Sequence, residues 1–213
     1  MQRTLVSLAA SSAVFVSLFA TADAAPRIVH VRGTVVAVTA STVDVKTTTG
    51  VVHLATTGAK FVVVAPSSRS AIGPNTFVGI ATDGEAPGAK AREVVVFPNA
   101  MRGTGEGHYA WDLPQGGDAM TNGTVAPAGS AMTNGNAGAR KTTNGQLMLN
   151  VAYKGGSRRI DVPANVPIVV AKPGMRSDLA TGSHVVAFAT EKSGKPDVVK
   201  SVIIGQGSTV PPM

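Results

Sequence analysis

The sequence predicts an all-β protein that contains two related small barrels in tandem. Short runs rich in β-branched residues recur along the chain, separated by turn residues such as Thr49-Gly50. No long segment has helical periodicity. Short strands at close spacing are typical of a small barrel or sandwich. The strands predicted in the first half cover residues 28–38, 42–46, 51–54, 61–64, 76–81 and 93–97.

The second half of the chain repeats the pattern of the first. Residues 63–70 align with residues 170–177, so that Pro66 matches Pro173 and Arg69 matches Arg176. With one extra residue, the alignment continues to the valine-rich runs near positions 95 and 203. An arginine matched in both copies is expected to have a shared structural role, such as holding a loop carbonyl. The repeat predicts a first barrel at 27–100, a second barrel at 146–207 and a tail at 208–213.

The segment between the two copies, residues 101–145, differs in composition. It is rich in Gly, Asn, Ala, Thr and Ser, and Met-Thr-Asn-Gly occurs in it twice. Such a composition buries little apolar surface, so the segment is predicted to be a joining loop. Residues 121–125 have an alternative assignment as the first strand of the second barrel, because Gly123-Thr124-Val125 matches Gly33-Thr34-Val35.

The first 25 residues have the three-part pattern of a secretory signal peptide. Arg3 precedes an apolar run, and Ala22-x-Ala24 fits the small-residue cleavage rule. No later stretch is long and apolar enough to span a membrane. The chain contains no cysteine and has a formal net charge of +7. We therefore expect export, a periplasmic location and no integral membrane domain.

Several motifs resemble an uncharacterised bacterial exported family that contains a small OB-like β-barrel domain of unknown function. They are the Gly33-Thr34-Val35 run, the Gly105–Asp112 segment (GEGHYAWD), Met120-Thr121-Asn122 and the Val-Pro-Pro-Met end. Members of that family are often labelled metal ABC transporter permeases, although a permease needs several spanning helices. The resemblance implies two OB-like barrels in tandem, joined by the Gly/Asn/Ala-rich loop, and it implies no specific activity.

The GEGHYAWD segment carries most of the residues with recognisable chemistry. Glu106, His108 and Asp112 lie within seven positions, and imidazole and carboxylate groups bind zinc, nickel, copper or iron. Met101 and Met120 could add thioether ligands. The interpretation that we favour is structural: Trp111 closes a barrel end or the seam between the domains, while Tyr109 and His108 bond nearby loops.

A second group of candidate residues is basic. Lys154, Arg158 and Arg159 flank the Gly155-Gly156 turn, where they could contact an anionic polymer. The chain has few aromatic residues for stacking on bases, so no nucleic acid is expected. Tyr109 and Trp111 are the other predicted contact residues.

The sequence contains no nucleophile elbow and no recognisable pair of catalytic carboxylates, so no enzyme is predicted. The favoured function is a non-enzymatic binding or interaction module of the cell envelope, with an unidentified envelope partner. One alternative is a periplasmic accessory protein that binds a transition metal through His108 with Glu106 or Asp112. A further alternative is a binder of anionic polymer on a basic barrel face. No cofactor other than a transition metal is predicted, and the oligomeric state is left open.

Overall fold

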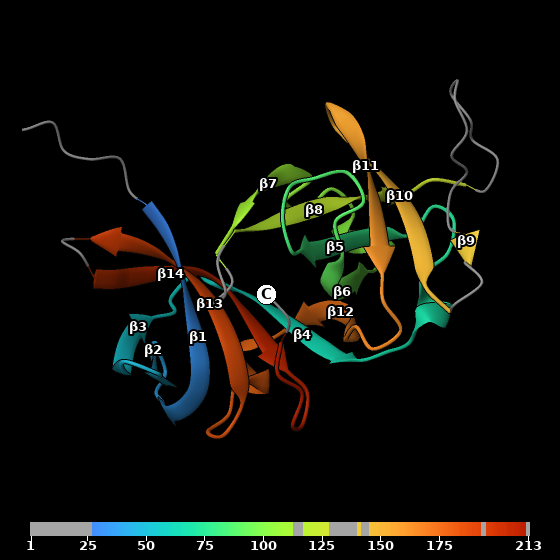
Figure 1. Cartoon of the computed structure of the whole chain (residues 1–213). Helices are drawn as coiled ribbons and strands as arrows, with labels where there is room; N and C mark the ends of the chain where they lie inside the picture. The colour runs from blue at the N-terminus through green and yellow to red at the C-terminus, as the bar shows by residue number, and fades with distance from the viewer. Residues whose placement is uncertain (1–26, 113–116, 128–139, 142–144, 193–194, 212–213) are drawn as a thin grey trace, which may run out of the picture.

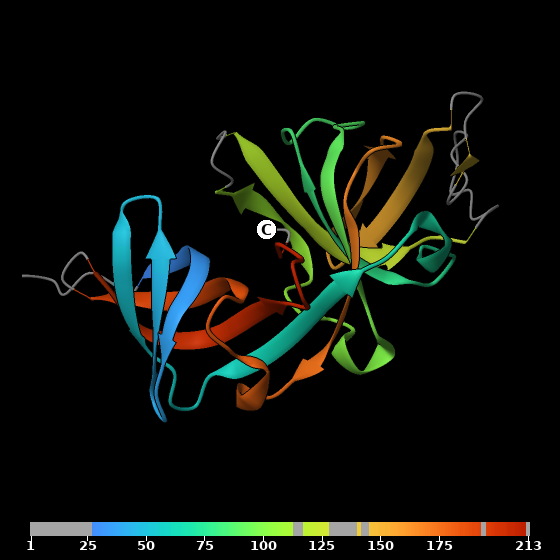
Figure 2. The ribbon, with the colours of Figure 1, turned by 90° about the horizontal axis from the view of Figure 1, so that it is seen from below.

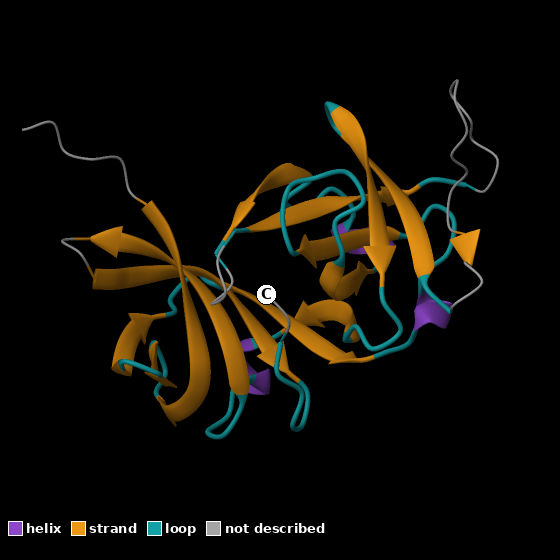
Figure 3. Ribbon diagram, in the orientation of Figure 1, coloured by secondary structure: helices purple, strands orange, loops and turns teal. Residues whose placement is uncertain are grey.

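The structure is a computed structural model that describes residues 27–112, 117–127, 140–141, 145–192 and 195–211. The predicted signal peptide, 1–25, lies outside the described residues. The described chain is all-β, as predicted, and none of its helices is long and apolar enough to cross a membrane (Figure 3). The strands are β1 Arg27–Val38, β2 Thr42–Thr47, β3 Gly50–Ala55, β4 Lys60–Pro66, β5 Phe77–Thr82, β6 Ala91–Phe97, β7 Gly107–Trp111, β8 Asp118–Val125, β9 Arg140–Lys141, β10 Leu147–Tyr153, β11 Gly156–Val162, β12 Ile168–Gly174, β13 His184–Lys192 and β14 Lys195–Gly205. The 3-10 helices are η1 Arg69–Ala71, η2 Asn99–Met101 and η3 Arg176–Asp178.

The described strands form one 14-stranded sheet that folds into two lobes (Figure 1). The first lobe contains β1, β2, β3, β13 and β14, and the second contains β5, β6, β8, β10 and β11. Between them, β4 and β12 pair antiparallel with each other. Figure 2 shows β4 running from one lobe to the other. Each of these two strands also pairs in parallel with one lobe, β4 with β14 and β12 with β6.

The two lobes have the same pairing pattern, and each lobe takes its hairpin from the other copy of the repeat. The strands β1, β2 and β3 correspond in the sequence repeat to β8, β10 and β11, and the β5–β6 hairpin corresponds to β13–β14. The first three strands of each copy pair with the hairpin of the other copy: β1 pairs with β13, and β8 pairs with β5. A parallel bridge completes both lobes at equivalent places, Val198 to Ala55 and Lys90 to Asp161.

Because of this exchange, neither lobe is built from only one of the predicted ranges 27–100 and 146–207. Strand β1 pairs with β13 of the other range, although the pairs β1–β2, β5–β6 and β13–β14 each stay within one range. The physical reason is that both copies offer the same pairing register, so a repeat identifies equivalent strands without identifying their partners. The predicted loop at 101–145 also differs from the structure. It contains β7 and β8, and β8 includes the Gly123-Thr124-Val125 run at the position equivalent to β1. In the predicted tail 208–213, Pro211 is buried and Val210 is exposed.

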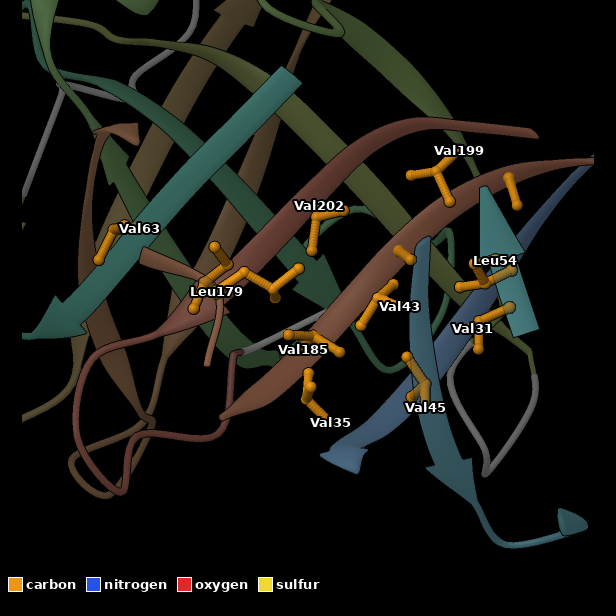
Figure 4. Packing of buried hydrophobic residues seen from close by; sticks show 13 residues of the cluster. Val31, Val35, Val43, Val45, Leu54, Val63, Leu179, Val185, Val199 and Val202 are labelled. Atoms are coloured by element: carbon orange, nitrogen blue, oxygen red, sulfur yellow. The ribbon is translucent and has the colours of Figure 1, made fainter. Parts of the chain in front are cut away.

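Three clusters of buried side chains hold the sheet together. In the first lobe, valines from β1 and β2 and Leu54 of β3 meet valines from β13 and β14, as Figure 4 shows for Val31, Val43 and Val202. An equivalent cluster fills the second lobe around Ile80 and Leu149. The third cluster lies between the lobes and includes Val64 of β4, Val186 and Ile203 of the first lobe, and Phe77, Phe97 and Met120 of the second. The junction between the lobes is therefore packed with apolar side chains.

Two residue types matched in the repeat have matched structural roles. A Cβ on Gly33 would lie 2.1 Å from the Lys46 carbonyl oxygen, and a Cβ on Gly123 would lie 2.4 Å from the Ala152 carbonyl oxygen. The first strand of each copy therefore approaches its neighbour too closely for any side chain. Arg176 donates to the carbonyl oxygens of Thr39 and Thr42 in the first lobe. Arg69 donates to those of Gly145 and Val162 in the second lobe, so each arginine holds a carbonyl pair of the other copy.

Candidate functional site

Strand β7, which contains most of the GEGHYAWD segment, pairs antiparallel with β8 from Gly107↔Asn122 to Trp111↔Asp118. Successive side chains of a strand point to opposite faces. His108 therefore points to one face, while Tyr109 and Trp111 point to the other. This alternation separates the imidazole of the predicted site from the two aromatic rings.

The end of β7 contacts the first lobe. The Trp111 ring lies 4.5 Å from the His30 ring and 6.1 Å from the Phe188 ring, centroid to centroid. Asp112 Oδ1 lies 2.5 Å from His30 Nδ1 and accepts a hydrogen bond of 2.9 Å from Arg32 Nη2. Burial raises the pKa of Asp112, but the hydrogen bonds and charges of Arg32 and His30 hold it below its usual range. The structural interpretation of Trp111, as a residue at the seam between two units, agrees with these contacts.

The three predicted metal ligands lie against different neighbours. His108 Nδ1 lies 2.8 Å from the Thr121 hydroxyl, and its ring stacks at 6.1 Å on Tyr153. Glu106 accepts a hydrogen bond of 3.0 Å from the Lys154 backbone N–H, whereas Asp112 is held by the first lobe. Burial lowers the pKa of His108, and the charge of Arg158 lowers it further, against an opposing effect of Glu85. In the described part of the chain, no three His, Asp or Glu side chains gather as a metal would require.

Met101 and Met120 instead line a groove between the lobes, together with Tyr109 and Trp111. The groove has a volume of about 720 Å³ and is mainly apolar. Its lining comes from β4, β6, η2, β7, β8, β12, β13 and β14, so residues far apart in the sequence meet here. We call this hollow the junction groove. Among the described residues it is lined by Ala59, Lys60, Phe61, Val62, Phe97, Ala100, Met101, Thr104, Gly105, Tyr109, Trp111, Met120, Asn122, Pro173, Gly174, Phe188, Ser201 and Ile203.

The strand register explains which side chains of the first lobe face the junction groove. Phe188 pairs with His30 on β1 and with Ser201 on β14, and Ser201 pairs with Lys60 on β4. Paired residues on neighbouring strands point to the same face of a sheet. Because the Phe188 and His30 rings contact Trp111, Ser201 and Lys60 share that face.

The neighbouring row of side chains on the same face of the sheet is apolar. It contains Val62 of β4 and Ile203 of β14, which pair with each other, and Pro173 of β12, which pairs with Val62. The floor of the junction groove therefore has an apolar row beside a row that carries an ammonium and a hydroxyl group.

Two polar atoms in the lining have no hydrogen-bond partner in the described structure, Asn122 Oδ1 and Trp111 Nε1. Asn122 is only 7% exposed, and its Nδ2 donates to the Gly105 carbonyl at 3.1 Å and to the Tyr109 hydroxyl at 3.2 Å. Burial raises the pKa of Tyr109, although the residue is 38% exposed. Buried polar atoms are normally paired, so each of these two unpaired atoms calls for an explanation.

The predicted basic residues lie outside the lining of the junction groove. Lys154 and Arg159 are exposed on the β10–β11 hairpin. The Arg158 guanidinium donates to the Glu85 carbonyl, which ties this hairpin to the loop before β6. The hairpin therefore carries three cations, of which Arg158 ties it to the loop before β6.

A group of charged residues at the lobe junction was not singled out by sequence reasoning. Glu93 on β6 is partly buried and Asp118 on β8 is buried, and Arg92 Nε lies 2.7 Å from Asp118 Oδ1. Burial raises the pKa of Glu93 to about 7, with Arg32 opposing the shift and Asp118 adding to it. The available signal in the sequence was a pair of charged residues, Arg92 and Glu93, at the start of the valine-rich strand β6.

Comparisons with known proteins returned no similarity on which a function could rest. No protein-family model, no curated protein and no solved structure matches the chain. The resemblance to an exported family with OB-like domains therefore stays a prediction from the sequence.

Proposed function

We propose that this chain is an exported, non-enzymatic binding module of the bacterial cell envelope, and that it binds an apolar ligand in the junction groove. The observation that carries the proposal is the groove itself: a hollow of about 720 Å³ between two lobes, lined by aromatic and methionine side chains. Ligand sites have volumes of roughly 300–1,000 Å³, favour domain interfaces and combine an apolar lining with a few polar atoms. The junction groove has each of these features.

We further propose that each lobe is an OB-like barrel. Each lobe has five strands. In each lobe, one parallel bridge joins the last of the first three strands back to the hairpin. OB folds are five-stranded, partly open barrels that bind ligands through one face and its loops. In this protein the ligand would contact the surface where the two units meet.

A binding role is favoured over catalysis by the chemistry of the lining. Its described residues include no His, Asp, Glu or Cys side chain. His is the most frequent general acid or base, and Asp, Glu and Cys supply many of the remaining catalytic acids, bases and nucleophiles. An apolar lining with aromatic rings instead favours the burial of a hydrophobic body, which releases water from apolar surface on both sides.

Trp111 is the only tryptophan of the chain and lines the junction groove, so its fluorescence reports directly on occupancy. The probe is N-phenyl-1-naphthylamine, which is neutral, apolar and an acceptor for tryptophan emission. We expect saturable binding to the mature protein with energy transfer from Trp111. The Tyr109→Ala variant removes a ring from the lining and should weaken binding by about fivefold or more.

Tyr153→Ala is the matched control, because Tyr153 stacks on His108 and does not line the groove. It should bind the probe like the unmodified protein. Circular dichroism of both variants checks that the fold is kept. No saturable binding, or equal weakening in both tyrosine variants, contradicts the proposal.

A further inference from the structure

We infer that the ligand of the junction groove is a single-chain anionic amphiphile, with its chain on the apolar row and its head group at Lys60 and Ser201. This inference rests on the proposed function and specifies the class of ligand. It depends on three features of the groove: the sign of its charge, the position of that charge, and the shape of the apolar surface beside it.

The charge of the lining has one sign. Lys60 is the only residue among the described lining that carries a charge at neutral pH, and no carboxylate accompanies it. Lys60 is exposed, whereas Val62 behind it is partly buried and Ile203 is buried; Pro173, at the end of the row, is exposed. An ammonium group at the open edge of an apolar hollow attracts an anion and leaves the interior free for hydrocarbon.

The hydroxyl of Ser201 lies beside this charge. Ser201 and Lys60 are paired residues on the neighbouring strands β14 and β4, so both side chains point to the groove face. An ammonium and a hydroxyl group side by side can both donate to the oxygens of a carboxylate or a phosphate. Lys60 is the first residue of β4, which places this pair at the edge of the floor.

The apolar surface extends from this pair toward the second lobe. Val62 and Ile203 follow Lys60 and Ser201 on the same face, two residues further along each strand. Met101 and Met120 of the second lobe also line the groove, although Met120 is only 1% exposed. Methionine is flexible and adapts to chains of varied shape. A linear hydrocarbon chain fits an apolar surface of this kind, and its head group would then meet Lys60, the only cation of the described lining.

The test displaces N-phenyl-1-naphthylamine with four amphiphiles of equal chain length, all below the concentration at which they form micelles. The anions are dodecanoate and dodecyl phosphate; dodecyl maltoside is the neutral control and dodecyltrimethylammonium is the cationic control. We expect at least one anion to bind about fivefold more tightly than both controls. Which of the two anions binds more tightly identifies a carboxylate or a phosphate head group.

Lys60→Gln should weaken the preferred anion about fivefold and leave dodecyl maltoside unchanged. Lys172→Gln is the matched control, because Lys172 pairs with Val63 and therefore faces away from the junction groove. The inferred ligand class is wrong if the neutral probe binds but the anions and dodecyl maltoside bind equally tightly. It is also wrong if the cationic amphiphile binds most tightly. In both cases the proposed binding function of the junction groove is retained. If neither the probe nor any amphiphile binds, the proposed function itself fails.

Discussion

Replacing Glu93 by glutamine removes a carboxyl group that the fold makes costly to ionise. Glu93 lies on β6 opposite Ala81 of β5, and its Oε1 is buried without a hydrogen-bond partner in the described structure. The pKa of Glu93 rises from 4.5 to about 7, because the effect of burial is larger than the opposing effect of the Arg32 charge. A raised pKa means that the folded protein binds this proton more tightly than the unfolded chain does.

The sign of the pH dependence follows from this difference. Near pH 4 both states hold the proton, so Glu93 costs nothing. As the pH rises from 4.5 to 7, the unfolded chain loses the proton first, and the stability of the fold decreases. Above pH 7 the whole cost applies, which is about 3 kcal/mol for a shift of this size.

Glutamine has the same shape and no charge, so Glu93→Gln should stabilise the protein at pH 8 by up to about 3 kcal/mol and have little effect at pH 4. For a chain of this size that is a rise in Tm of roughly 6–12 °C. Thermal unfolding followed by circular dichroism at both pH values measures it. Glu85→Gln, at an exposed residue of the same lobe, is the control. A variant that is destabilised at pH 8, or equally affected at both pH values, refutes the reasoning.

Three further substitutions test the fold by urea unfolding. Gly33→Ala should cost about 3 kcal/mol of stability or prevent folding, because the added Cβ would clash with a carbonyl oxygen. Gly73→Ala is the control: its nearest atom lies 3.8 Å from the added Cβ, so it should cost less than about 1 kcal/mol. Arg176→Gln should cost about 2 kcal/mol, because the carbonyls that it holds lose their donor; an unchanged midpoint would exclude this role. Asp112→Asn should cost less than about 1 kcal/mol at pH 7, and the cost should decrease as the pH falls through the lowered pKa of Asp112.

The strands and the repeat could be predicted from sequence because they depend on local pattern. Alternating β-branched residues identify a strand wherever it pairs, and the matched positions of Arg69 and Arg176 identify a shared role. The exchange of hairpins could not be predicted. Strand β13 forms with β1 the same kind of ladder that β5 forms with β8. The two hairpins are therefore equivalent partners, and the sequence contains no signal that distinguishes pairing within a copy from pairing between copies.

The candidate site was predicted only in part, for a similar reason. The aromatic residues Tyr109 and Trp111 drew attention because they are rare in this chain, and both line the junction groove. Glu106, His108 and Asp112 are close in sequence, but strand alternation and separate partners direct them to different neighbours. Lys60 and Ser201 are 141 positions apart and become neighbours only through the parallel pairing of β4 and β14.

The exchanged hairpins also set an order of events for a chain that emerges N-terminus first during synthesis. The first three strands must wait for β13 and β14, the last strands to arrive, before their lobe can close. The second lobe closes earlier, because its last strand is β11. Until the end of the chain arrives, the valines of β1 and β2 have no partner surface, which is a condition that favours aggregation or capture by a chaperone. Truncation after β12 would leave one lobe complete and the other without two of its five strands.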